Sequence, residues 1–76
     1  LQILILNYIR RLMGFIVKLL DSGNYFTAGE DDMDTTPSRE EAVANGQFTH
    51  YEEAKETAEY WSGQMVLGVD YIIESV

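Results

Sequence analysis

Cysteine is absent from the chain, and histidine occurs only once, at His50. The lack of cysteine excludes a disulfide framework and a thiolate zinc site within this chain. A single histidine makes a poor set of metal ligands, and neither Thr49 nor Ser62 forms a recognisable catalytic triad with it. No glycine-rich phosphate loop is found either. We therefore predict a non-enzymatic protein with no catalytic residue, no metal site and no cofactor.

Basic residues are scarce as well, since five lysines and arginines face thirteen aspartates and glutamates, for a net charge of −8. Residues 1–20 carry three of the basic residues and no acid, whereas residues 21–76 have a net charge of −11. Such a field repels nucleic acid phosphates, so direct DNA or RNA binding is not expected. It favours a protein partner with a basic surface, although the same charge also serves solubility alone.

The chain also lacks an apolar run long enough to span a membrane. Nine mostly apolar residues precede Arg10 and Arg11, whereas a membrane-spanning helix needs about 20. As a helix, residues 1–12 gather their large apolar side chains on one face. We expect this face to pack on the rest of the chain, or on a second copy as a homodimer through residues 1–12. Attachment to a membrane surface is the alternative.

Met13-Gly14 is a natural start for the part of the chain that has the pattern of a folded domain. We therefore interpret residues 1–12 as an amphipathic N-terminal extension and residues 13–76 as a single small domain. A chain of this size buries only about 60% of its unfolded surface, which leaves little stability to spare.

A β-hairpin is predicted within residues 14–29. The apolar run Phe15–Leu20 and the run Tyr25–Ala28 flank an Asp-Ser-Gly-Asn turn, which is the usual hairpin signature. Strand alternation places Phe15, Val17 and Leu19 on one face and Ile16, Lys18 and Leu20 on the other. We interpret the acid-rich segment 29–37 that follows as a solvated loop. It lacks the glycine and glutamate that a calcium-binding EF-hand loop requires.

Two helices and a closing strand are predicted after this loop. Thr36 caps the first helix, which ends at Gly46 in a left-handed conformation. The second helix runs from His50 to about Ser62 and ends at Gly63, with Thr49 and Glu52 as a capping box. Its inner face holds Tyr51, Ala54, Ala58, Trp61 and Met65. Residues 65–76 are rich in β-branched and aromatic side chains and predict a strand, with Gly68 at a bulge or close approach.

These elements predict an α+β fold, in which the hairpin and the C-terminal strand form a small antiparallel sheet and the main helix packs on it. The alternative is an all-α helical bundle, with one helix over residues 1–20 and another over residues 49–75.

The order of motifs from Met13 to Val76, about 64 residues, resembles a loose class of very small phage and mobile-element proteins. The motifs are the strand-turn-strand start FIVKLLDSGNYFT, the helical turn SREEA, the helix opening FTHYEEAKETAEYW and the closing strand VDYIIESV. Residues 1–12 depart from this pattern. Some members bind and block host defence proteins, including restriction and CRISPR machinery. The resemblance therefore implies an inhibitor or adaptor of a nucleic-acid-binding host protein, in the host cytoplasm, and it transfers no catalytic residue.

The FTHYEEA segment is also similar to the tail of some antitoxins of toxin–antitoxin pairs. That similarity covers about 18 residues and implies an antitoxin-like regulatory partner. An accessory subunit of a larger assembly is a further alternative.

We predict that a protein partner binds the outer face of the main helix. Glu52, Glu56 and Glu59 share one side of this helix, and Glu53 and Tyr60 flank it. Tyrosine is frequent at binding hot spots, and carboxylates pair with lysine and arginine on a partner. The acids of the preceding loop extend this surface, namely Glu30, Asp31, Asp32 and Asp34. A plain solvated helix face is the competing interpretation.

Overall fold

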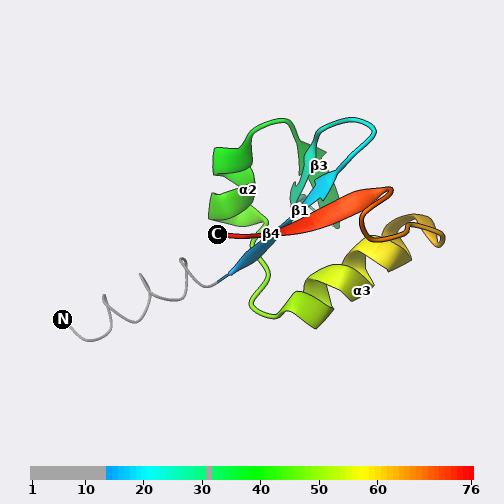
Figure 1. Ribbon diagram of the computed structural model, residues 1–76. Coiled ribbons are helices and arrows are strands. Elements are labelled where there is room, and N and C mark those ends of the chain that lie inside the picture. Colours follow the sequence, from blue (N-terminus) through cyan, green and yellow to red (C-terminus); the bar gives the residue numbers. More distant parts are fainter. Residues whose placement is uncertain (1–13, 31) are drawn as a thin grey trace.

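The computed structural model describes residues 14–30 and 32–76 (Figure 1). The helix, homodimer and membrane-surface predictions for residues 1–12 lie outside these residues. Within them, four strands and two helices follow one another: β1 (Phe15–Leu19), β2 (Tyr25–Ala28), β3 (Met33–Thr36), α2 (Arg39–Asn45), α3 (Tyr51–Ser62) and β4 (Tyr71–Ser75).

The strands form one antiparallel sheet in the order β3-β2-β1-β4. β1 therefore lies inside the sheet, between the hairpin partner β2 and the C-terminal strand β4. The register between β1 and β4 runs from Phe15 opposite Ser75 to Leu19 opposite Tyr71. The protein thus has the predicted α+β fold, and the all-α alternative is wrong.

The hairpin of β1 and β2 matches the prediction, except that β1 ends at Leu19. The Leu19 amide donates to the Asn24 carbonyl at 2.7 Å, and the Gly23 amide donates to the Leu19 carbonyl at 2.9 Å. Gly23 has a φ of +76°, a backbone conformation that side chains with a Cβ rarely adopt. The glycine of the turn is therefore required by its backbone conformation.

The interpretation of residues 29–37 as a loop is wrong, because Met33–Thr36 forms the edge strand β3. It pairs with β2 from Ala28 opposite Met33 to Tyr25 opposite Thr36. Met33 packs against the core, whereas Asp34 is exposed. Charged side chains are common on edge strands, where they discourage pairing with another chain. The acids that indicated a loop are thus compatible with a strand that has only one neighbour.

The two helices cover opposite faces of the sheet (Figure 1). On one face Val17, Leu19, Phe26 and Tyr71 pack with Ala54 and Ala58 of α3. On the other face Ile16 and Tyr25 pack with Ala42 of α2. The predicted alternation along β1 is therefore confirmed. The two small alanines of α3 let this helix approach the sheet closely.

The start of α2 differs from the prediction, since Ser38 and not Thr36 is its N-cap. The Ser38 Oγ accepts a hydrogen bond from the Glu41 amide at 3.2 Å. The Thr36 hydroxyl instead donates to the Glu41 carboxylate at 2.8 Å and accepts from the Ser38 amide at 3.2 Å. Both residues thus bind the first turn of α2, Thr36 from the end of β3 and Ser38 from the N-cap position.

The end of α2 also differs, because Gly46 has a φ of −121° and is not left-handed. A Cβ on Gly46 would clash with the backbone carbonyl oxygen of Phe26. The glycine is therefore required for the close approach between the helix end and β2.

α3 begins at Tyr51, one residue later than predicted, and its N-cap is His50 without a side-chain capping bond. The predicted capping box of Thr49 and Glu52 is therefore wrong, because Thr49 precedes the cap position. The end of α3 is as predicted. Gly63 has a φ of +78°, and its amide donates to the Glu59 carbonyl at 3.0 Å.

The predicted C-terminal strand is shorter than residues 65–76, because a turn precedes β4. The Asp70 carboxylate accepts a hydrogen bond from the Val66 amide at 2.8 Å, and the Asp70 amide donates to the Val66 carbonyl at 2.9 Å. Gly68 has a φ of +86° with open space around it. Gly68 is therefore a turn residue, and the bulge or close approach predicted there is wrong.

Candidate protein-binding site

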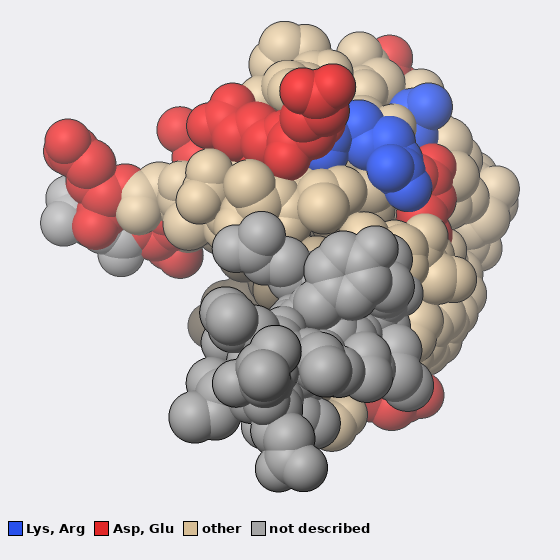
Figure 2. All heavy atoms as spheres, turned by 90° about the vertical axis from the view of Figure 1, so that its left-hand side faces the viewer, with Lys and Arg blue, Asp and Glu red and all other residues tan. Residues whose placement is uncertain are grey.

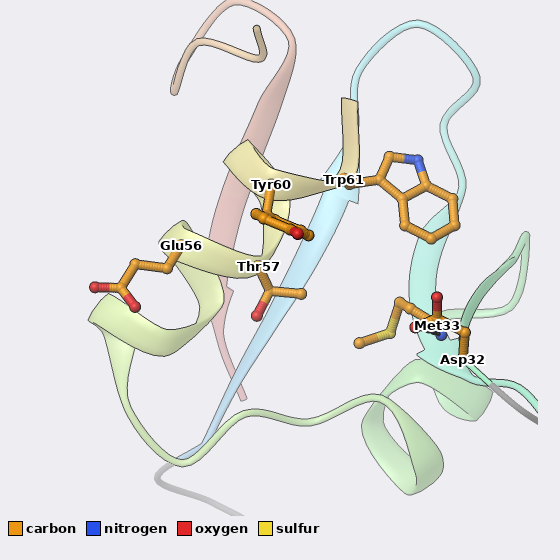
Figure 3. Close-up of a pocket in the computed structure, with 6 residues that line it drawn as sticks. All are labelled: Asp32, Met33, Glu56, Thr57, Tyr60 and Trp61. Carbon is orange, nitrogen blue, oxygen red and sulfur yellow. Dashed lines mark hydrogen bonds between the residues drawn. The ribbon is translucent and has the colours of Figure 1, made fainter. Parts of the chain in front are cut away.

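A groove of about 600 Å³ lies between the start of β3 and the last turns of α3 (Figure 3). Two of its lining residues come from the β3 side and four from α3: Asp32, Met33, Glu56, Thr57, Tyr60 and Trp61. Three of them, Asp32, Glu56 and Tyr60, belong to the predicted partner surface. The structure thus brings one predicted loop acid, Asp32, close to Glu56 and Tyr60 of the predicted helix face.

The groove exists because α3 does not cover the whole sheet. α3 contacts β1 and β4, whereas β3 lies at the opposite edge of the sheet. Met33 of β3 and Phe26 of β2 face the same side of the sheet as α3. The space between the helix and this edge is therefore only partly filled, and it stays open to the surface.

Aromatic and apolar side chains make up part of the groove lining. The Trp61 ring lies 5.2 Å from the fully buried Phe26 ring, at an angle of 54°. Trp61 nonetheless remains 44% exposed, and the neighbouring Tyr60 is 90% exposed. Figure 3 shows the methyl group of Thr57 turned toward Met33. Two aromatic rings that would bury apolar surface on contact are therefore open to a ligand.

The two carboxylates of the groove differ in how firmly they are placed. One oxygen of Asp32 accepts a hydrogen bond from the Met33 amide at 2.7 Å, which fixes the carboxylate at the start of β3. The Glu56 side chain extends from α3 with its carboxylate turned away from Asp32 and Met33 (Figure 3). Both residues are exposed. Asp32 is thus a hydrogen-bond acceptor held in place by the backbone, whereas Glu56 is an exposed side chain without such a bond.

Glu59 has a structural role that its place in the sequence did not reveal. Its Oε2 accepts a hydrogen bond from the Tyr71 hydroxyl at 2.9 Å and lies 3.2 Å from the Lys55 Nζ. These contacts, that with Tyr71 first, hold the pKa of Glu59 below its usual value. Burial and then the bond to Glu59 raise the pKa of Tyr71 to about 12. Glu59 therefore ties α3 to β4 and lies outside the groove.

The other predicted partner residues are dispersed around the groove. Glu52 and Glu53 are exposed in the first turn of α3, and Glu30 is exposed beside the start of the β2–β3 connection. Asp34 is exposed one residue after Met33, so it points to the opposite face of the sheet. Asp31 lies outside the described residues. Of the predicted partner acids, only Asp32 and Glu56 thus line the groove.

Most acids of the described chain have no cationic partner there. Arg39 pairs with Glu74 at 3.2 Å, Lys55 pairs with Glu59, and Lys18 lies 5.7 Å above the Tyr25 ring. On the face shown in Figure 2, the basic atoms gather in one area and acidic atoms appear on several sides of it. No ion pair forms within residues 14–30 and 32–76 for Glu30, Asp32, Asp34, Glu52, Glu53 or Glu56.

Sequence reasoning missed three residues of the groove. The helical spacing predicts Trp61 on the inner face of α3, and its ring does pack on Phe26, but it also lines the groove. The signal for its second role is that the single tryptophan of the sequence adjoins another aromatic residue, Tyr60. Met33 and Thr57 carry no such signal, because their place in the groove depends on the strand β3.

The described residues were also compared with the requirements of a metal site and of a membrane-spanning helix. Across residues 14–30 and 32–76, no three acidic or histidine side chains converge as metal ligands. His50, at the start of α3, is exposed. No helix of the described segments has both the length and the apolar character needed to cross a bilayer.

Comparisons of the chain with protein-family models, with curated proteins and with solved structures found no match. The functional interpretation is therefore built on the groove and on the distribution of charge.

Proposed function

We propose that this chain is a small acidic protein-binding module that occupies a basic surface of a nucleic-acid-binding protein, as an inhibitor or adaptor. The observation that carries the proposal is the groove between β3 and α3. There, exposed aromatic rings lie among carboxylates that have no cationic partner in the described chain.

Charge supports the choice of partner. A surface that binds nucleic acid is rich in lysine and arginine, because it neutralises phosphates. An acidic module is electrostatically complementary to such a surface and is steered toward it. The net charge of −11 over residues 21–76 gives this chain the sign that nucleic acid has. Binding would then exclude nucleic acid from the occupied surface.

The aromatic residues support a specific contact over a purely electrostatic one. Long-range charge alone gives weak, salt-screened attraction. Tyrosine and tryptophan are enriched among the residues that dominate binding energy at protein interfaces. Tyr60 and Trp61 supply such anchors in the groove that Asp32 and Glu56 also line.

The resemblance to small phage and mobile-element proteins supports a more specific form of the proposal. In that form the target is a host defence protein, and the chain acts in the host cytoplasm. An antitoxin-like role predicts a different partner, a toxin encoded by a neighbouring gene.

The test is a pull-down with the tagged full chain from host lysate, with bound proteins identified by mass spectrometry. The test variant is Glu52→Lys/Glu56→Lys, and the matched control is Asp21→Lys/Glu40→Lys, which changes the net charge equally at exposed positions away from the groove. Glu59 is left intact because it bonds to Tyr71.

We expect one nucleic-acid-binding protein or complex to bind the wild-type chain and the control, to be released by salt, and to be lost with the test variant. Equal losses with both variants would show non-specific charge attraction and contradict the proposal. Recovery of a small toxin-like protein that resists high salt would instead favour the antitoxin-like role.

A further inference from the structure

We propose that the groove between β3 and α3 binds an arginine side chain presented by the partner. This inference rests on the proposed function, since it takes the occupant from a basic protein. It goes further by naming the chemical group that enters the groove and the residues that contact it.

The shape of the groove suits one long side chain and the peptide around it. Its volume of about 600 Å³ falls within the range of ligand pockets in proteins. Met33 lines it from the β3 side and Thr57 lines it from the α3 side (Figure 3). Their apolar groups would contact the methylene stem of a bound side chain, which buries such stems readily.

The charge of the groove favours a cationic occupant. Asp32 and Glu56 line it from the two sides, and its lining includes no lysine or arginine. Asp32 uses one oxygen to accept from the Met33 amide, so its second oxygen remains an acceptor for a ligand. An anionic group would be repelled by these carboxylates, and a neutral donor would form only ordinary hydrogen bonds, whereas a cation would form the stronger charge-assisted ones.

Arginine fits better than lysine because of the two aromatic rings. A guanidinium group is planar, stacks on aromatic faces and is more weakly hydrated than an ammonium group. Trp61 offers the ring type that attracts cations best, and Tyr60 stands beside it with nearly all of its surface in water. A guanidinium in the groove would stack on one of these rings and donate a hydrogen bond to Asp32.

Trp61 also makes the inference directly measurable, because it is the only tryptophan of the chain. The tripeptide acetyl-Gly-Arg-Gly-amide is titrated into the full chain while tryptophan emission is recorded. We expect a saturable change with a dissociation constant on the order of 1 mM, as suits a single side chain. The same peptide with lysine should bind more weakly, and the peptide with uncharged citrulline should give no saturable change.

The variant for the groove is Asp32→Asn, and the matched control is Glu40→Gln, an exposed position of α2 that loses the same charge. Asparagine keeps a side-chain oxygen for the Met33 amide, so β3 should be unaffected. We expect Asp32→Asn to weaken binding of the arginine peptide about two- to fivefold, as for loss of an exposed ion pair. The control should leave the dissociation constant unchanged. A second variant, Glu56→Gln, is compared with the same Glu40→Gln control and tests the carboxylate that lines the groove from α3.

Three results would overturn the inference: no saturable change with the arginine peptide, an equal response to the citrulline peptide, or equal weakening by the groove and control variants. These outcomes differ from failure of the proposed function. If the arginine peptide gives no saturable change in tryptophan emission, but the pull-down recovers a partner that Glu52→Lys/Glu56→Lys loses, only the arginine site is overturned. If the arginine peptide binds saturably, but the pull-down recovers no partner whose binding depends on Glu52 and Glu56, the proposed function is overturned and the arginine site is supported.

Discussion

Replacing Tyr71 by phenylalanine removes one hydroxyl from a fully buried ring and leaves the packing of the ring in place. That hydroxyl donates to the Glu59 carboxylate at 2.9 Å and so links β4 to α3. A hydrogen bond to a charged acceptor contributes about 1.5–3 kcal/mol when both groups are buried. Glu59 is partly exposed and keeps Lys55 as a partner. We therefore expect Tyr71→Phe to lower the free energy of unfolding by about 1 kcal/mol.

Thermal and urea unfolding of the full chain measure this difference. For a domain of this size, 1 kcal/mol lowers the melting temperature by about 4–8 °C. Tyr60→Phe is the matched control, because Tyr60 is exposed and should change stability little. In a double-mutant cycle with Glu59→Gln, the two effects should be strongly non-additive. Equal stability of Tyr71→Phe and the wild-type chain would refute the role assigned to this bond.

The pH dependence of the same pair gives a second readout. The pKa of Tyr71 is raised from 10.0 to about 12 in the folded protein, so the neutral hydroxyl is favoured by folding. Its contribution is fully present below pH 10 and is lost as the pH rises toward 12. The pKa of Glu59 is lowered, so its contribution is present at neutral pH and is lost as the pH falls through the lowered value. The stability difference between wild type and Tyr71→Phe should narrow at both extremes.

Further predictions concern backbone contacts, caps and the turn before β4. Gly46→Ala should destabilise the protein by about 1–3 kcal/mol in urea unfolding, because the added Cβ meets the Phe26 carbonyl. Unchanged stability would show that the helix end and β2 are farther apart. Ser38→Ala should cost about 1 kcal/mol, because Ser38 caps α2, whereas Thr49→Ala should cost little, because α3 has no side-chain cap. A larger loss of stability for Thr49→Ala than for Ser38→Ala would contradict these assignments and favour the capping box of Thr49 and Glu52. Asp70→Ala should lower the melting temperature by removing the acceptor of the Val66 amide, and an unchanged value would argue against that turn.

Local signals in the sequence were sufficient for the elements that local chemistry determines. The hairpin follows from a turn with glycine at a positive φ between two apolar runs. The position of α3 follows from the helical spacing of Ala54 and Ala58 and from the stop at Gly63. In both cases, neighbours in the chain decide the structure.

Elements that depend on a distant partner could not be predicted in the same way. β3 has the sequence Met-Asp-Thr-Thr, with one large apolar side chain, and it is a strand because β2 offers it hydrogen bonds. The groove could not be predicted without β3, because the order of strands in the sheet brings Met33 and Trp61 to the same groove. Glu59 illustrates the same limit, because its bond to Tyr71 joins elements whose contact no periodicity indicates.

The most direct test of the proposed function is competition for the partner. The purified nucleic-acid-binding partner is loaded with fluorescently labelled nucleic acid, and the full chain is titrated into the complex at low salt. We predict that the chain displaces the nucleic acid, that Glu52→Lys/Glu56→Lys does so much less, and that Asp21→Lys/Glu40→Lys acts like the wild type. A stable ternary complex of chain, partner and nucleic acid would contradict occupation of the basic surface.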